Sequence, residues 1–280
     1  MMKLSIIITA FNEEKTIGRA IDSFLCQKEL KNYDYEIIGV APDAPTLNVI
    51  KSYSKNNRRV KFLKDPHKGK PSALNLVFKK AKGEILILTD GDVHVTNNSI
   101  KELLKPFSDK SIGAVAGHPL SSSPKNTLLG YWSHVLTGVA HKLRLKSLKD
   151  KSFIHCTGYL YAIRAGIVNN IPVNALVDDG FISHKIFSEG FKIGYAQHAE
   201  VFVKYPDNFA DWVMQKKRSA GGYNQLKDFG IDVKSHKGRG FFWEALGSLR
   251  IIRYATSLKE LYWSILLLFS RLYLWVVIFR

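Results

Sequence analysis

The chain has few cysteines and few acidic residues for its length. Only two of its 280 residues are cysteines, Cys26 and Cys156. Nothing in their spacing calls for a disulfide, so we expect a reducing compartment. Lysine and arginine number 41 against 24 aspartates and glutamates, which gives a formal net charge of +17. This excess predicts an anionic partner: a nucleic acid, a phosphorylated substrate or the negatively charged face of a membrane.

Several familiar motifs are also absent. No GxGxxG follows the first apolar run and no GxxxxGK[ST] occurs, which disfavours a dinucleotide-binding fold and a P-loop enzyme. The opening MMKLSIIITAFNEEKT lacks the long apolar region and small-residue cleavage site of a signal peptide. No zinc spacing, RNP-like aromatic stretch or helix-turn-helix accompanies the basic residues, so we expect no nucleic-acid partner.

The first 120 residues alternate between apolar runs and amphipathic segments. Short apolar runs read as buried strands, and apolar residues at helical spacing read as helices packed on them. This alternation predicts an α/β fold with a doubly wound, mostly parallel, Rossmann-like sheet, in which ligands bind beyond the carboxyl ends of the strands. The expected strands are 3–9, 35–40, 60–63 and 84–89, and the expected helices begin at Asn12, surround 47–53 and cover 72–81.

The second half is less regular and ends in an apolar tail. We expect helices over 126–146, 177–190 and 207–222, the last ending in glycines, strands over 153–164 and 192–197, and helical structure from Gly238 onward. Tyr262–Phe279 is long enough to cross a bilayer, but Arg271 lies in its middle. Its apolar residues each favour insertion by about 0.3–0.6 kcal/mol, whereas a central arginine costs about 2.5–3.5 kcal/mol. A spanning helix and a helix lying in the interface, or packed on a partner, both stay open.

The segment EILILTDGDVH, residues 84–94, ends a buried strand with polar side chains. In an extended chain Asp90, Asp92 and His94 project to the same side. Buried carboxylates need a partner, because leaving them unpaired is costly. Two carboxylates and an imidazole could hold a divalent cation, which could in turn hold a diphosphate.

Several motifs together resemble family 2 glycosyltransferases. They occur in the family's order over about residues 3–222: SIIITAFNEEKTIGRAIDSFLCQ, HKGKPSALN, TDGD, TGYLYAIR, VDDGFISHKI and QKKRS. Members of this family are inverting enzymes of the GT-A fold that use nucleotide-diphosphate sugars. The resemblance implies a GT-A domain over 1–222 and a basic, apolar, membrane-associated region over 223–280.

The same resemblance implies a metal site in TDGD, the family's DxD motif. Asp90 is then near the ribose or base of the donor and contributes to the metal site, and Asp92 binds Mg²⁺ or Mn²⁺. His94 lies where some relatives place a third, polar ligand. Hard cations take carboxylate oxygens and leave positions for phosphate.

For the donor nucleotide, the resemblance implies that Thr9, Phe11 and Glu13 line the nucleoside and that Lys70 approaches the phosphates. A helix N-cap at Asn12 is the alternative for the first loop, and the two interpretations are compatible. Asp43 is displaced from the position of the acidic pair that holds the base in other members, so the base stays open.

The resemblance assigns residues of two further motifs to the transfer to the acceptor. VDDG implies Asp179 as the general base, supported by Asp178; a charged helix N-terminus is the alternative for both. In QKKRS, Gln215 and Arg218 match the QxxRW motif of membrane polysaccharide synthases, and Arg218 would neutralise the departing diphosphate. Ser219 replaces the tryptophan, which weakens the case for processive polymerisation.

The expected function is therefore transfer of a sugar to an acceptor at the cytoplasmic face of a membrane. Basic and aromatic residues in 131–149 and 240–255, with the apolar tail, predict contact with membrane lipids. The acceptor is expected to be lipid-linked, either a polyprenyl phosphate or a glycan on such a lipid. A processive synthase, a nucleic-acid-binding protein, a non-catalytic membrane adaptor and a sugar-phosphate nucleotidyltransferase are the alternatives.

Overall fold

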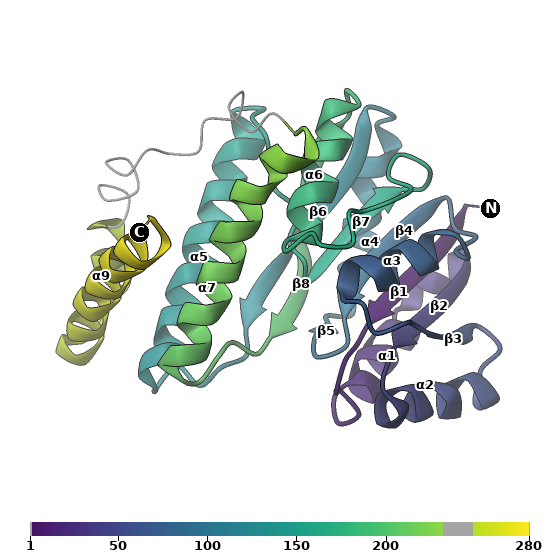
Figure 1. Ribbon diagram of the computed structural model, residues 1–280, viewed down its shortest axis with the longest axis horizontal. Helices are drawn as coiled ribbons and strands as arrows, with labels where there is room; N and C mark the ends of the chain where they lie inside the picture. The colour runs from purple at the N-terminus through teal and green to yellow at the C-terminus, as the bar shows by residue number, and fades with distance from the viewer. Residues whose placement is uncertain (1, 232–248, 280) are drawn as a thin grey trace.

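The protein forms one mixed eight-stranded sheet covered by helices, with a long helical layer at one end (Figure 1). The computed structural model describes residues 2–231 and 249–279. The strand order is β3-β2-β1-β4-β7-β6-β8-β5. The strands are β1 (Lys3–Thr9), β2 (Asp34–Ala41), β3 (Val60–Lys64), β4 (Ile85–Asp90), β5 (His94–Val95), β6 (Ile112–Ser121), β7 (Leu160–Arg164) and β8 (Lys192–Val203). The α-helices are α1 (Ile17–Leu25), α2 (Ala44–Asn56), α3 (Lys70–Phe78), α4 (Ser99–Leu104), α5 (Leu128–Lys149), α6 (Asp178–Ser188), α7 (Phe209–Gln225) and α9 (Leu258–Phe279).

The amino-terminal half of the sheet is parallel, as the sequence predicts. β1 pairs in parallel with both β2 and β4, and β2 pairs in parallel with β3. Ile6 and Ile8 of β1 pack with α1 on one face, whereas Ile7 packs with α3 and α6 on the other. Burial on both faces explains why consecutive residues of this strand, 6–8, are all isoleucine.

The helix expected from Asn12 begins later, at Ile17. The prediction of an N-cap at Asn12 is wrong, because the backbone around it is used elsewhere. Asn12 has a positive φ of 55° and donates its N–H to Asp43 Oδ1 at 3.0 Å. The N–H of Glu13 donates to Thr46 Oγ1 at 2.9 Å. The first loop is therefore tied to the start of α2 instead of starting a helix.

The expected strand over 153–164 is shorter than predicted and runs against its neighbour. Only Leu160–Arg164 (β7) is a strand, and it pairs antiparallel with β4 and β6. The preceding loop directs its backbone toward α6: the N–H of Cys156 donates to Ser183 Oγ at 2.9 Å. Strand β6 and helix α4 were not predicted from the sequence; β6 lies between β7 and β8 in the sheet.

Helix α7 continues through the glycines that were expected to end it. A Cβ atom at Gly222 would lie 2.6 Å from the side chain of Val177, so this glycine allows α7 to approach the start of α6 closely. The helix ends at Gln225, so the domain boundary expected at residue 222 falls inside it.

Helix α9 packs along α5 and α7 (Figure 1). Leu267 and Leu274 of α9 belong to a buried cluster with Tyr131, Trp132 and Trp212. The Tyr131 hydroxyl lies 2.8 Å from Ser264 Oγ, and Trp132 Nε1 donates to the carbonyl of Trp263 at 2.8 Å. Residues 258–277 are long and apolar enough to cross a membrane, with 17% of the most apolar window buried against the protein. Most of the basic, aromatic segment expected over 240–255 lies outside the described residues.

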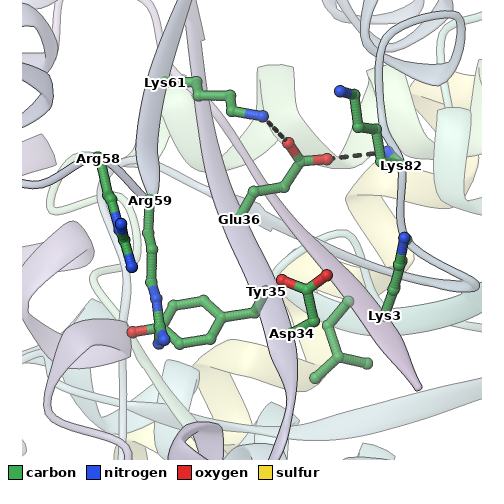
Figure 2. A pocket seen from close by; sticks show the side chains of 10 residues that line it. Lys3, Asp34, Tyr35, Glu36, Arg58, Arg59, Lys61 and Lys82 are labelled. Carbon is green, nitrogen blue, oxygen red and sulfur yellow. Dashed lines mark hydrogen bonds and ion pairs between the residues drawn. The ribbon is translucent and has the colours of Figure 1, made fainter. Parts of the chain in front are cut away.

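A cavity of about 330 Å³ lies at the amino ends of the parallel strands (Figure 2). Glu36 lies between Lys61 and Lys82: it is ion-paired with the Lys61 ammonium and accepts the Lys82 N–H at 2.8 Å. The Ser5 hydroxyl also donates to Glu36, at 2.7 Å. Since Lys3 and Thr9 lie at opposite ends of β1, this cavity is separate from the carboxyl ends where ligands are expected.

Substitution of Tyr131 by Phe tests the packing of α9. It removes the hydroxyl that meets Ser264, so we expect the free energy of unfolding to fall by about 0.5–1.5 kcal/mol. Chemical denaturation measures the change, and Tyr262→Phe, at an exposed position of α9, is the matched control. Equal stabilities of the two variants would contradict the packing of α9 on α5.

Candidate active site

An acidic cluster lies at the carboxyl ends of the central strands, where the fold predicts a ligand site. It contains five carboxylates around one ammonium group: Glu13, Asp90, Asp92, Asp178 and Asp179 around Lys70. β1 and β4 contribute their ends, and α3 and α6 contribute their first residues. The cluster is thus built from four segments that are far apart in the sequence.

Lys70 links three of these elements. Its ammonium lies 2.6 Å from Asp90 Oδ1 and 3.5 Å from Asp178 Oδ2. Thr9 Oγ1 donates to the same oxygen of Asp90 at 3.2 Å. Burial acts to lower the pKa of Lys70, but Asp178 and Asp90 outweigh it and raise that pKa above its ordinary value. Lys70 therefore stays protonated as the internal counter-ion of the cluster.

Asp179 has the features of a general base. Its Oδ2 accepts the N–H of Gly158 and its Oδ1 accepts the N–H of Gly180, both at 2.8 Å. Burial and then the charge of Asp178 raise the pKa of Asp179 to about 6, against the opposing effect of Lys70. A carboxylate with a pKa near the working pH can accept a proton efficiently. Asp178 and Asp179 also form the first turn of α6, so the VDDG motif starts a helix. This position is compatible with a catalytic role.

Glu13 and Asp92 form no ion pair with Lys70 or with any other cation among the described residues. Glu13 Oε2 is buried and accepts no hydrogen bond from the described residues. Burial, followed by the charges of Asp92 and Asp90, raises the pKa of Glu13 to about 8. Asp92 is more exposed, yet desolvation and Asp90 also raise its pKa. Glu13, Asp90 and Asp92 fit a divalent cation chemically, because a nearby positive charge would stabilise the ionised form of each carboxyl group.

His94 does not form a three-ligand metal site with Asp90 and Asp92. Its Nε2 is 2.9 Å from Arg19 Nη2, and its ring stacks on Phe202 with the centroids 5.0 Å apart. Burial and the charge of Arg19 lower the pKa of His94. Among residues 2–231 and 249–279, no group of three histidine, cysteine or acidic side chains is arranged to hold a metal. A cation bound by Asp90 and Asp92 would therefore need further ligands from its substrate.

The first loop and the end of β2 face the same region. Phe11 is half exposed and its ring centroid lies 5.0 Å from that of His67. Asp43 caps α2, with Oδ2 accepting the N–H of Thr46 at 3.0 Å. Burial raises the pKa of Asp43, but hydrogen bonds from Thr46 and Asn12 outweigh it and hold that pKa below its usual value. The carboxylate of Asp43 thus organises the loop that carries Phe11.

The residues of the QxxR motif lie in the middle of α7. Gln215 Oε1 is buried without a hydrogen-bond partner in the described part of the chain, and Arg218 is exposed. Lys216 between them has its pKa lowered to about 8, by burial and then by Arg271 of α9. No contact in the structure joins Gln215 or Arg218 to the acidic cluster among the described residues.

Two site residues were missed from the sequence. Burial raises the pKa of Tyr159 to about 12, and the charges of Asp90, Asp92 and Asp179 act in the same direction. Tyr205 packs against it with the ring centroids 5.8 Å apart. Tyr159 lies inside the TGYLYAIR motif, which is the one signal that could have identified it. Tyr205 comes from the loop after β8 and carries no such signal.

Comparison with known proteins decides the family. A family model described as Glycosyl transferase family 2 matches residues 5–170, more than half of the chain. The chain belongs to this family. It is 26% identical over 237 residues to a probable glycosyltransferase, YdaM of Bacillus subtilis, covering 79% of this chain and 55% of YdaM. It is also 28% identical over 105 residues to the poly(ribitol-phosphate) beta-N-acetylglucosaminyltransferase TarS of Staphylococcus aureus, covering 36% of this chain and 18% of TarS.

The structural comparison confirms the GT-A fold expected from the sequence. The mannosyltransferase PcManGT from Pyrobaculum calidifontis, solved with GDP-Man and Mn²⁺, superposes with a TM-score of 0.63 at 16% identity. The match covers 94% of this chain and 72% of that structure. The chain spans about half of YdaM and a smaller part of TarS.

The raised pKa of Glu13 predicts a pH-dependent stability. Folding opposes the ionisation of this side chain, so wild-type protein loses stability as the pH rises from the ordinary pKa of 4.5 toward the folded value of about 8. Glu13→Gln removes this loss and should be more stable than wild type by about 1–3 kcal/mol at pH 8. The two proteins should converge below pH 4.5.

Denaturation across this pH range measures the difference, with Glu14→Gln at the exposed neighbouring position as the control. A difference between wild type and Glu13→Gln that does not change with pH would contradict the burial of an ionisable Glu13.

Proposed function

We propose that the protein is an inverting, metal-dependent glycosyltransferase that moves a sugar from a nucleotide-diphosphate sugar to a lipid-linked acceptor at a membrane. The observation that carries this proposal is the acidic cluster, in which five carboxylates surround one ammonium at the ligand-binding edge of a GT-A sheet. Such an excess of negative charge suits a cation and, through it, an anionic donor. Family membership supports the same class of reaction.

In the proposed site, Asp92 and Asp90 would hold Mg²⁺ or Mn²⁺, which would supply positive charge to the diphosphate. Lys70 and Thr9 fix Asp90, while Phe11, Glu13 and the loop organised by Asp43 line the nucleoside. The GDP-Man and Mn²⁺ in PcManGT support a nucleotide sugar and a divalent cation as the ligands of this edge. His94 is not assigned as a metal ligand, because its Nε2 lies 2.9 Å from Arg19 Nη2.

Asp179 is the proposed general base. It would remove the proton of an acceptor hydroxyl while that oxygen attacks the anomeric carbon, and the nucleoside diphosphate would leave from the opposite face. Asp178 raises the pKa of Asp179 and holds Lys70 in place. Arg218, with Gln215 beside it, would approach the diphosphate when donor and acceptor are bound. If the attacking group is itself a phosphate, Asp179 only orients it.

Residues 223–280 are proposed to hold the enzyme on the membrane, and 1–222 to carry out transfer. One face of α9 packs on the protein, but large apolar residues are exposed along the other face: Leu258, Tyr262, Ile265, Phe269, Leu272, Tyr273 and Val276. Their spacing of three to four residues forms a continuous stripe along the helix. Exposed stripes of this kind favour lipid, and the net charge of +17 favours the anionic cytoplasmic leaflet.

Substitution of the two aspartates tests the mechanism. Asp179→Asn should lower turnover by about 10²–10⁴-fold, because it removes the base, but should leave donor binding unchanged. Asp92→Asn should abolish the effect of Mn²⁺ on donor binding. Release of nucleoside diphosphate from UDP- and GDP-sugars, with lipid extract as acceptor, measures turnover, and Asp207→Asn at an exposed position is the control. Full activity of Asp179→Asn would refute the assignment of the base.

Substitution of the exposed stripe tests membrane binding. Each large apolar side chain buried in lipid contributes about 1.5–3 kcal/mol. Phe269→Gln combined with Leu272→Gln should therefore weaken binding to vesicles containing phosphatidylglycerol by about a hundredfold or more. Phe62→Gln combined with Val173→Gln alters two apolar side chains exposed elsewhere and serves as the control. Equal sedimentation of the two double variants with vesicles would contradict the role of α9.

A further inference from the structure

A group of polar side chains between α5, β6 and β8 takes no part in the proposed chemistry. The rings of His118 and His141 stack with centroids 4.0 Å apart and planes 15° apart. His141 Nδ1 lies 2.7 Å from the hydroxyl of Tyr195, and the Arg144 guanidinium lies 5.9 Å from the Tyr195 ring. We call these four residues, from three separate elements, the Arg144 cluster.

The Arg144 cluster has no internal anion. Within the described residues, Arg144 forms no ion pair and no hydrogen bond with a carboxylate. Burial lowers the pKa of His118 and of His141; for His141 the neighbouring His118 is the next cause, and the charge of Arg144 lowers both pKa values further. Lys142 adds to this effect on His141, while the nearest acid in strand register, Glu200 opposite His118, forms no ion pair with the cluster.

A bulge in the sheet builds one side of this cluster. The pairing of β6 with β8 jumps from Ala116↔Tyr195 to His118↔Glu200, so β8 carries additional residues between these pairs. The carbonyl of Gln197 in this bulge lies 2.9 Å from His118 Nδ1 and fixes the ring. Bulges of this type redirect side chains and are frequent beside functional sites.

The Arg144 cluster and the proposed base, Asp179, act electrostatically on the same two residues. Burial raises the pKa of both Cys156 and Tyr223; the charge of Asp179 raises them further, and the charge of Arg144 opposes it. Cys156 and Tyr223 are therefore within electrostatic reach of both groups. Tyr195 and Cys156 also belong to one buried cluster.

The same helix joins the Arg144 cluster to the membrane-facing part of the protein. Farther toward its amino end, α5 packs on α9 through Tyr131 and Trp132. Lys142, between His141 and Arg144 in the sequence, lies over the ring of Tyr254 at 4.5 Å, and Tyr254 comes shortly before α9 begins. Helix α5 thus connects the Arg144 cluster with α9, the helix proposed to contact the membrane.

We propose that Arg144, with His141 and His118, binds a phosphate ester of the acceptor while the acceptor's attacking oxygen faces Asp179. This inference rests on the proposed function, which supplies the acceptor. It adds the residues that would bind the acceptor's phosphate. A guanidinium presents paired N–H donors that match phosphate oxygens, and two histidines add donors once a phosphate supplies the missing negative charge. The phosphate belongs either to a polyprenyl lipid or to a free polyol phosphate.

Binding of citronellyl phosphate, a short polyprenyl phosphate, to the full chain tests the proposal. Wild type should bind it at least tenfold more tightly than citronellol, which lacks the phosphate. Arg144→Gln should weaken citronellyl phosphate binding about tenfold or more, and Arg144→Lys should weaken it less. Lys146→Gln removes an exposed positive charge of the same helix and should leave binding unchanged. Isothermal titration calorimetry measures the affinities, and circular dichroism checks that each variant is folded.

Glycerol 3-phosphate distinguishes the two sources. Tight binding of glycerol 3-phosphate would identify the acceptor as a free polyol phosphate. Binding of citronellyl phosphate but not of glycerol 3-phosphate would identify it as a lipid. Equal affinity of wild type for citronellol and citronellyl phosphate would overturn the proposal, as would equal losses in Arg144→Gln and Lys146→Gln. A protein that binds citronellyl phosphate through Arg144 but binds no nucleoside diphosphate would refute the proposed function and keep this phosphate site.

Discussion

The contact between the Lys70 ammonium and the carboxylates of Asp90 and Asp178 is the interaction on which the site depends. It joins the end of β4, the start of α3 and the start of α6. Without this positive charge, five carboxylates would lie together with no internal counter-ion, and several would take up protons instead. One lysine makes the cluster compatible with a folded protein but leaves it short of positive charge. A bound metal ion would supply the missing positive charge and would in turn attract an anionic donor.

The backbone around the cluster supports this arrangement. Gly158 donates its N–H to Asp179, and the loop before β7 is held in place by Ser183. On the other side, Asp43 fixes the loop that carries Phe11 and Glu13. Rigid elements thus hold Asp90 and Asp178, which neighbour the proposed metal ligand Asp92 and the proposed base Asp179, in contact with Lys70. Such preorganisation is what catalysis of group transfer requires.

The parallel half of the fold was predictable because β1, β2 and β4 carry central apolar runs and the helices between the strands are amphipathic. The direction of β7 was not, since an antiparallel strand between two parallel groups leaves no trace in local periodicity. The clustering of Asp90, Lys70 and Asp179 followed from the family resemblance, whereas their mutual charge effects needed the fold. Gly222 was misread as a helix end because its close approach to Val177 is a tertiary contact. The stacking of His118 on His141 and the exposure of one face of α9 likewise depend on packing between distant segments.

The central claim is that the acidic cluster binds a nucleoside diphosphate only through a divalent cation. Isothermal titration calorimetry of UDP and GDP into the full chain, with Mn²⁺ and with a chelator, tests it most directly. The account predicts binding of at least one of the two in Mn²⁺, loss of that binding in the chelator, and proton release on binding near pH 7 as Glu13 ionises. Binding of equal strength in the chelator, or no binding of either nucleotide in Mn²⁺, would contradict it.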